Sequence, residues 1–199
     1  MLIGLLDYGA GNQGSIKSAL KQIDMEFIDI KGAEEISTVD SLVIPGVGAF
    51  STGIQNLSRN GISESVIKYA KSGNQVVGIC LGMHLLATYG EEGGGAAGLD
   101  LISGEIRKLE KSKDERVPHV GWDLITNVEN NDKNFAYFAH SYYFEIKGNE
   151  KCDVPFTFKW EDKTLPAVIR KDNIFGIQFH PEKSHTYGLK MLSKILKVK

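Results

Sequence analysis

The residue best suited to do chemistry in this sequence is Cys80. It follows the compact, β-rich run Gln75–Ile79 and has a glycine two residues before it and another two residues after it. Such glycines let a strand turn sharply into a helix, which is the nucleophile-elbow pattern with cysteine in place of serine. N–H groups at the start of that helix favour a thiolate and can stabilise an oxyanion. The same short pattern also fits a small buried residue at a strand end.

A cysteine nucleophile needs an imidazole base, and His180 is the candidate. The apolar run Ile174–Phe179 predicts a strand that delivers His180, Pro181 ends its ladder, and Glu182 follows at once. An acid in this position can hold the imidazole in one tautomer. The alternative is a surface histidine beside a surface acid. Because Cys80 and His180 both come at strand ends, where α/β sheets place their sites, the catalytic interpretation is favoured.

The first half of the chain must position Cys80, and it alternates apolar runs with segments of helical spacing. Strands are predicted at Leu2–Leu6, Phe27–Ile30, Ser41–Ile44 and Gln75–Ile79, and helices at Ser15–Ile23 and Ile62–Ala70. Alternation of this kind predicts an α/β fold with a doubly wound, mostly parallel sheet.

The second half, which must position His180, is predicted to be richer in strands. Between Glu105 and Phe179 the apolar runs are short and aromatic and helical periodicity is weak, so mostly antiparallel or mixed strands are expected. A last helix is predicted at about Thr186–Val198, and exposed loops at Glu91–Gly98 and Lys111–Arg116. Because no repeat or linker interrupts the chain, residues 1–199 are expected to form a single domain.

Composition excludes several classes of function. The 199 residues are 42% hydrophobic and 24% charged with a net charge of −2, which gives no electrostatic reason to expect nucleic acid or an anionic membrane as partner. No apolar run approaches the roughly 20 residues of a transmembrane helix. The apolar start lacks a basic leader and reaches Asp7 too early for a signal peptide. Two cysteines, Cys80 and Cys152, suit a reducing compartment, so a cytoplasmic location is expected.

Three blocks together resemble the signature blocks of class I (triad-type) glutamine amidotransferases: Gly78–Gly82, Pro45–Gly48 and His180–Glu182. The resemblance implies a flavodoxin-like fold and a catalytic triad of Cys80, His180 and Glu182. In that mechanism the cysteine forms a γ-glutamyl thioester and ammonia is released, with no cofactor and no metal.

The same resemblance assigns oxyanion contacts to Val47, Gly48 and Leu81. It assigns substrate contacts to Glu92, Ser141, Tyr142 and His84. The family usually has glutamine at position 84, and a neutral imidazole one helical turn beyond Cys80 can still donate to a carbonyl or carboxylate. A metal site formed by Cys80, His84 and His180 is conceivable, but no further carboxylate or thiol cluster accompanies these residues.

Further blocks resemble the glutaminase subunits of imidazole glycerol phosphate synthases: Asp7–Asn12, Pro45–Phe50, Val117–Trp122, His140–Tyr143 and Gln178–Ser184. This implies a heterodimer with a (β/α)₈-barrel cyclase subunit in histidine biosynthesis, to which ammonia passes directly. An enclosed path is expected because ammonia reacts only while unprotonated, and water would protonate or dilute it.

The resemblance places Asn12, Trp122, Asp123 and Lys183 at the partner interface. The Val117–Trp122 block can be read as a docking surface or as a turn with one core tryptophan. Asp123 stands where the family usually has asparagine, which puts a charge at the expected interface. Lys183 is expected near the mouth of the ammonia path.

Three alternatives stay open from the sequence. His84, Asp123 and the continuation His185–Gly188 are also typical of paralogues that supply ammonia to a sugar amidotransferase in surface-polysaccharide biosynthesis. The run Gly9–Gly14 satisfies the G-x-G-x-x-G pattern of NAD-binding Rossmann proteins, and Asp29 ends the next strand. A peptidase or other thiol hydrolase could share the elbow and would act without a partner or a preference for glutamine.

Overall fold

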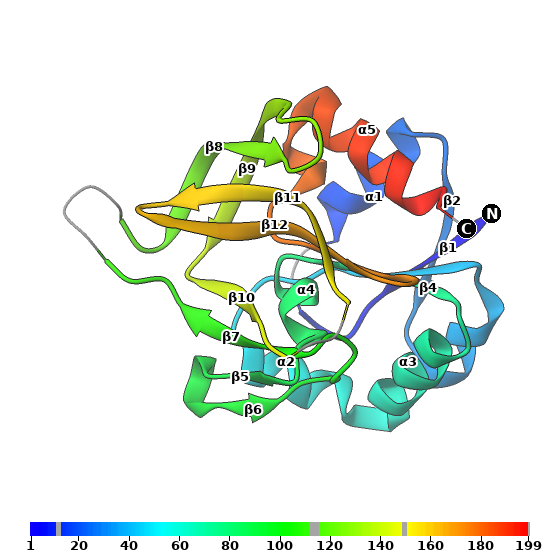
Figure 1. Ribbon diagram of the computed structural model, residues 1–199. Helices are drawn as coiled ribbons and strands as arrows, with labels where there is room; N and C mark the ends of the chain where they lie inside the picture. Colours follow the sequence, from blue (N-terminus) through cyan, green and yellow to red (C-terminus); the bar gives the residue numbers. More distant parts are fainter. Residues whose placement is uncertain (11–12, 112–115, 149–150, 199) are drawn as a thin grey trace.

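The structure, a computed structural model, describes residues 1–10, 13–111, 116–148 and 151–198 (Figure 1). Within these residues one sheet has nine strands, in the order β2-β1-β3-β4-β13-β12-β11-β8-β9, and a second has four, in the order β10-β7-β5-β6. The strands of the larger sheet are β1 (Leu2–Leu6), β2 (Glu26–Ile30), β3 (Ser41–Ile44), β4 (Gln75–Ile79), β8 (His119–Asn127), β9 (Lys133–His140), β11 (Asp153–Trp160), β12 (Lys163–Lys171) and β13 (Ile174–Ile177). Those of the smaller sheet are β5 (Tyr89–Gly90), β6 (Ala96–Ala97), β7 (Gly104–Lys108) and β10 (Tyr142–Ile146).

The first half of the chain forms the parallel part of the larger sheet, as predicted, and β13 from the second half joins it. Strands β2, β1, β3, β4 and β13 run parallel to one another. Alternate residues face opposite sides: Val76 belongs to one hydrophobic cluster and Val77 to the other. Both faces are therefore covered, which is why β3 and β4 are buried along their whole length and are mostly apolar.

Helices cover the two faces, so the prediction of a doubly wound α/β fold is confirmed. Helices α1 (Gly14–Gln22) and α5 (His185–Leu196) lie on one face (Figure 1). Helices α2 (Phe50–Leu57), α3 (Ile62–Lys71) and α4 (Leu81–Leu85) lie on the other. Short 3₁₀ turns complete the chain at Ala33–Thr38, Arg59–Gly61, Glu92–Gly94 and Pro181–Lys183. None of the described helices is both long and apolar enough to cross a membrane.

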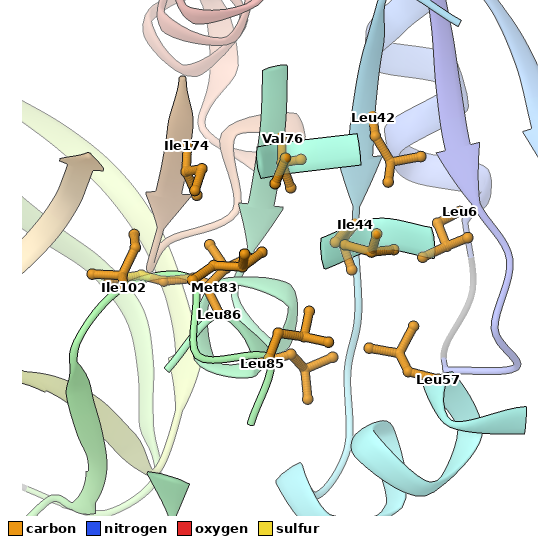
Figure 2. Packing of buried hydrophobic residues seen from close by; sticks show 14 of the residues in the cluster. Leu6, Leu42, Ile44, Leu57, Val76, Met83, Leu85, Leu86, Ile102 and Ile174 are labelled. Carbon is orange, nitrogen blue, oxygen red and sulfur yellow. The ribbon is translucent and has the colours of Figure 1, made fainter. Parts of the chain in front are cut away.

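The turn after Cys80 is anchored by apolar side chains. Met83, Leu85 and Leu86 are completely buried in the cluster that also contains Ile44 and Val76 (Figure 2). Burying an aliphatic side chain of this size contributes about 1.5–3 kcal/mol. The segment that carries the candidate nucleophile is therefore held against the sheet by its own hydrophobic residues.

The second half is antiparallel or mixed, also as predicted. In the larger sheet β13, β12, β11, β8 and β9 pair antiparallel in succession, and β10 pairs antiparallel with β7. Two details differ from the sequence interpretation. Most of the Val117–Trp122 block lies in strand β8 rather than in a turn, and the Glu91–Gly98 loop contains the short strand β6. Most of the predicted loop Lys111–Arg116 lies outside the described residues.

Candidate active site

Cys80 lies at the end of β4 in a backbone conformation that non-glycine residues rarely adopt, with φ 53° and ψ −109°. Both flanking glycines are required by close approach. A Cβ on Gly78 would collide with the carbonyl of Gly82, and a Cβ on Gly82 would collide with the carbonyl of Ile44. The following helix α4 has only five residues, so its dipole is that of a little over one turn. The local geometry is that of a nucleophile elbow.

His180 is brought to Cys80 because β13 pairs in parallel with β4, so that both strands end at the same edge. Nδ1 of His180 lies 2.8 Å from Oε1 of Glu182, and the two side chains are 5% and 7% exposed. Burial acts to lower the pKa of His180, but Cys80 and Glu182 together outweigh it and raise that pKa to about 10. Nε2 of His180 has no hydrogen-bond partner among the described residues and is available to the thiol.

Strand β9 backs both residues. The backbone N–H of His180 donates to the carbonyl of Tyr137 (2.8 Å), and Sγ of Cys80 lies 3.9 Å from the carbonyl oxygen of Ala139. The hydroxyl of Ser184 accepts from the N–H of Tyr137 and donates to the carbonyl of His180. The histidine backbone is therefore fixed by three hydrogen bonds to or through β9.

The Pro45–Gly48 loop follows β3, the neighbour of β4, and so reaches the same edge. The buried hydroxyl of Tyr8 donates to the carbonyl of Pro45 at 2.8 Å, and burial raises the pKa of this phenol. A Cβ on Gly46 would collide with that hydroxyl. Val47 is exposed, and Gly48 has φ +116°, which favours glycine. Sequence reasoning missed Tyr8, because nothing local links it to a loop about 37 residues away.

His84 lies on α4 but is buried rather than open. Its Nε2 lies 2.9 Å from Oε1 of Gln178, which is completely buried. Burial lowers the pKa of His84 to about 4, although the hydrogen bond to Gln178 acts in the opposite direction. The imidazole is therefore neutral near pH 7, and its Nε2–H donates to Gln178. Contact between His84 and glutamine stays a prediction.

The remaining predicted substrate residues gather on the side of the smaller sheet. Oε2 of Glu92 accepts from the N–H of Phe50 at the start of α2, while burial raises the pKa of this carboxyl. Glu92 is close enough to Tyr142 to help burial raise the pKa of that phenol. Ser141, which joins β9 to β10, accepts a bond from the N–H of Leu109 through its carbonyl. A glutamine site bounded by Glu92, Ser141 and Tyr142 is compatible with this geometry.

Of the residues predicted to meet a partner, Lys183 follows Glu182 directly and lines the same cavity, and Asn12 is outside the described residues. Trp122 is 44% exposed and stacks on His185 at 4.6 Å, so it is not a core tryptophan. Nζ of Lys183 lies 5.6 Å from the ring centroid of Tyr137, which also contacts Trp122. Asp123 Oδ2 lies 3.4 Å from Nε2 of His119, so its charge already faces a group of its own chain.

A cavity of about 350 Å³ lies beside His180 and Glu182. It is lined by residues of the triad, the glycine loop and α1, among them Gln13, Pro45, Val47, His180, Glu182 and Lys183. Within the described residues, Cys80, His84 and His180 form no grouping that could hold a metal ion. Asp29, the acid of the alternative NAD pattern, forms an ion pair with Lys17 at 2.7 Å.

Comparison with known proteins agrees with this geometry. Residues 4–198 match the family described as glutamine amidotransferase class-I. The chain is 40% identical over 200 residues to the imidazole glycerol phosphate synthase subunit HisH of Caldanaerobacter subterraneus subsp. tengcongensis, covering 96% of this chain and 95% of the relative. It is 36% identical over 210 residues to the subunit of the same name from Bacillus subtilis, covering 99% and 96%.

Solved structures show the same fold. A crystal structure of a glutamine amidotransferase superposes with a TM-score of 0.79 at 21% identity, covering 98% of this chain and 99% of that one. The structure of PurLQS from Thermotoga maritima gives a TM-score of 0.74 at 17% identity, covering 98% and 97%. The family match and the full-length relatives carry the conclusion: this chain belongs to the class I glutamine amidotransferase family.

Proposed function

We propose that this chain, as one domain spanning residues 1–199, is a glutaminase subunit that hydrolyses L-glutamine to glutamate and ammonia through a thioester on Cys80. Membership of the family makes it an enzyme that acts on the carboxamide C–N bond of glutamine. The observation that carries the residue assignment is the buried His180–Glu182 pair, whose remaining nitrogen, Nε2, is left for the thiol of Cys80. Two free cysteines, one of them the proposed nucleophile, suit a reducing compartment, so the cytoplasm is the proposed location.

In the proposed reaction the thiolate of Cys80 attacks the carboxamide carbon, and the C–N bond breaks after His180 gives its proton to the leaving nitrogen. Ammonia leaves and the γ-glutamyl thioester remains. His180, now neutral, takes a proton from water, whose oxygen attacks the thioester carbon and releases glutamate and the thiolate. Glu182 holds Nδ1 throughout and stabilises the imidazolium.

The tetrahedral intermediates in both steps carry a negative oxygen. We assign the N–H of Leu81 and an N–H of the Val47–Gly48 segment to this oxyanion, because both follow strand ends beside Cys80. Removing one such donor typically lowers kcat on the order of 10²–10³-fold. Glu92 is assigned to the amino group of glutamine, and Ser141, Tyr142 and His84 to other contacts with the substrate.

An exposed apolar surface supports a protein partner. Val120, Trp122 and Leu124 alternate along β8, so they share one face, and Phe135 lies directly opposite Leu124 on β9. All four side chains are exposed, Phe135 at 59%. A contiguous apolar patch of this kind is typical of protein interaction sites. We call these four residues the β8–β9 apolar surface.

This surface continues toward the candidate active site. Trp122 contacts Tyr137, Tyr137 contacts Lys183, and Lys183 lines the cavity beside His180. A partner bound over the surface would therefore cover the mouth of that cavity. Since the relatives are named as subunits of imidazole glycerol phosphate synthase, we propose a (β/α)₈-barrel cyclase that receives the ammonia directly.

The test is glutamine hydrolysis by the chain alone and with a cyclase subunit and its ligand. Low activity alone and strong stimulation in the complex are expected, and Cys80→Ala and His180→Ala should each abolish hydrolysis. Full activity in isolation would contradict the role as a dependent subunit. Stimulation by a sugar amidotransferase instead of the cyclase would support the alternative role in surface-polysaccharide biosynthesis. Heat of binding on titration with NAD, which the Asp29–Lys17 pair disfavours, would support the dinucleotide alternative.

A further inference from the structure

A chain of hydrogen bonds runs from strand β8 to the segment that joins the two sheets. His119 and His140 are cross-strand partners on β8 and β9. Nδ1 of His119 lies 3.3 Å from Nε2 of His140, and Nδ1 of His140 lies 2.7 Å from the carbonyl oxygen of Tyr142. His140 is buried, and His119 stacks on Phe138 at 4.7 Å. The mechanism proposed above uses neither imidazole.

The direction of each bond follows from chemistry. The carbonyl of Tyr142 can only accept, so Nδ1 of His140 carries the proton. Burial, reinforced by the nearby His119, holds the pKa of His140 well below its usual range, so this ring is neutral and its Nε2 accepts. Nδ1 of His119 must therefore be the donor. His119 therefore donates to His140, and His140 donates to the main-chain carbonyl of Tyr142.

The carbonyl of Tyr142 lies next to residues that are assigned above to glutamine binding. Ser141 is the single residue between β9 of the larger sheet and β10 of the smaller sheet. On one side of it, the carbonyl of Ala139 faces Sγ of Cys80. On the other side, Tyr142 lies near Glu92. The bond from His140 to Tyr142 spans Ser141 and closes this corner.

We propose that His140, held by His119, is a positioning residue for glutamine: it fixes the corner at Ser141 so that the main-chain N–H groups of Ser141 and Tyr142 face the substrate. The proposal rests on the function proposed above and deepens its substrate site. The carboxylate of Asp123 lies 3.4 Å from Nε2 of His119, on the side of the ring away from His140. The ring of His119 is held in place by aromatic rings, since it also packs against Phe158 and Trp160.

Steady-state kinetics of glutamine hydrolysis test the proposal with two variants of one residue. His140→Leu removes the donor, and the KM for glutamine should rise about tenfold or more while kcat changes less than about threefold. His140→Asn keeps a donor at the position of Nδ1 and should restore KM to within about threefold of the wild type. An unchanged KM in His140→Leu, or no rescue by asparagine, would overturn the proposal.

Phe158→Leu is the matched control, because Phe158 packs against both rings without a hydrogen bond to either. It should lower the melting temperature and leave KM unchanged. A rise in KM equal to that of His140→Leu would show that His119 and His140 act only through core packing. Nitrogen-15 NMR of the wild type should show His140 protonated at Nδ1 only. Protonation at Nε2 instead would contradict the proposal, and this readout stands even if the chain proves not to hydrolyse glutamine.

Discussion

Nδ1 of His180 lies 2.8 Å from Oε1 of Glu182, inside a site where both side chains are almost completely buried. A buried imidazole would ordinarily lose its proton readily, yet the pKa of His180 is raised to about 10 by Cys80 and Glu182 against the effect of burial. The carboxylate thus does two things: it fixes the tautomer, and it supports the charged form that must give a proton to the leaving nitrogen.

The first prediction concerns that carboxylate. Glu182→Gln keeps an acceptor for Nδ1 but removes the charge, so kcat for glutamine hydrolysis should fall on the order of 10²-fold, less than in Cys80→Ala. The pKa of His180 should fall as well, because the cation loses its counter-charge. NMR titration of His180 measures this directly. A pKa equal to that of the wild type would show that Glu182 does not stabilise the imidazolium.

The second prediction concerns Tyr8 and the glycine loop. Tyr8→Phe leaves the carbonyl of Pro45 without its 2.8 Å hydrogen bond, which should cost about 1 kcal/mol of unfolding free energy. Because the loop loses its anchor, kcat should also fall about tenfold. This loss is smaller than the roughly 10²-fold fall that follows complete removal of an oxyanion donor. Denaturant unfolding and initial rates measure the two effects.

Tyr69→Phe is the control for Tyr8→Phe. Tyr69 also donates a buried hydrogen bond to a main-chain carbonyl, that of Val39, at 2.9 Å. It should lose similar stability and keep its kcat. Equal losses of activity in the two variants would mean that the effect of Tyr8 is general destabilisation.

The third prediction concerns pH and His84. The pKa of His84 in the folded protein, about 4, lies below its ordinary value of 6.5, so the unfolded chain takes up this proton first as the pH falls. The contribution of neutral His84 to the unfolding free energy is therefore fully present above about pH 6.5 and is lost as the pH falls toward 4. Between pH 7 and pH 5 the loss from this residue is about 2 kcal/mol.

His84→Gln tests this because glutamine does not titrate and can still bond to Gln178. The fall in unfolding free energy from pH 7 to pH 5 should be smaller in the variant than in the wild type by about 2 kcal/mol. Urea unfolding at the two pH values is the measurement. Parallel pH dependences in the two proteins would show that His84 is not held neutral by burial.

The fourth prediction concerns the β8–β9 apolar surface. Trp122→Ala should weaken binding of the cyclase partner by about 2 kcal/mol, since exposed tryptophans are frequent energetic centres of interfaces. Unfolding free energy should change far less. Ile28→Ala is the control: Ile28 is also exposed and apolar but lies on β2, the opposite edge strand of the sheet. Calorimetric titration that gave equal affinities for the two variants would argue against this surface as the interface.

Much of the fold could be predicted from the sequence, because its signals are local. The strand before Cys80 is a compact run rich in β-branched residues, and its predicted bounds Gln75–Ile79 are those of β4. The glycines around Cys80 and the proline after His180 turn or end a strand, and they act within a few residues. Helix α2 is harder to predict, since Gly53 and Asn56 weaken its helical pattern.

By itself the sequence determined the chemistry that this protein can attempt: a strained cysteine at a strand end and a histidine followed by its acid, each specified by neighbours within five residues. Only the tertiary structure decided what surrounds them. The partner of His84 is Gln178, 94 residues away, and the partner of His140 is His119 on the neighbouring strand, 21 residues away. Such pairs depend on sheet register and burial, which arise from packing between distant segments and leave no periodic trace in the chain.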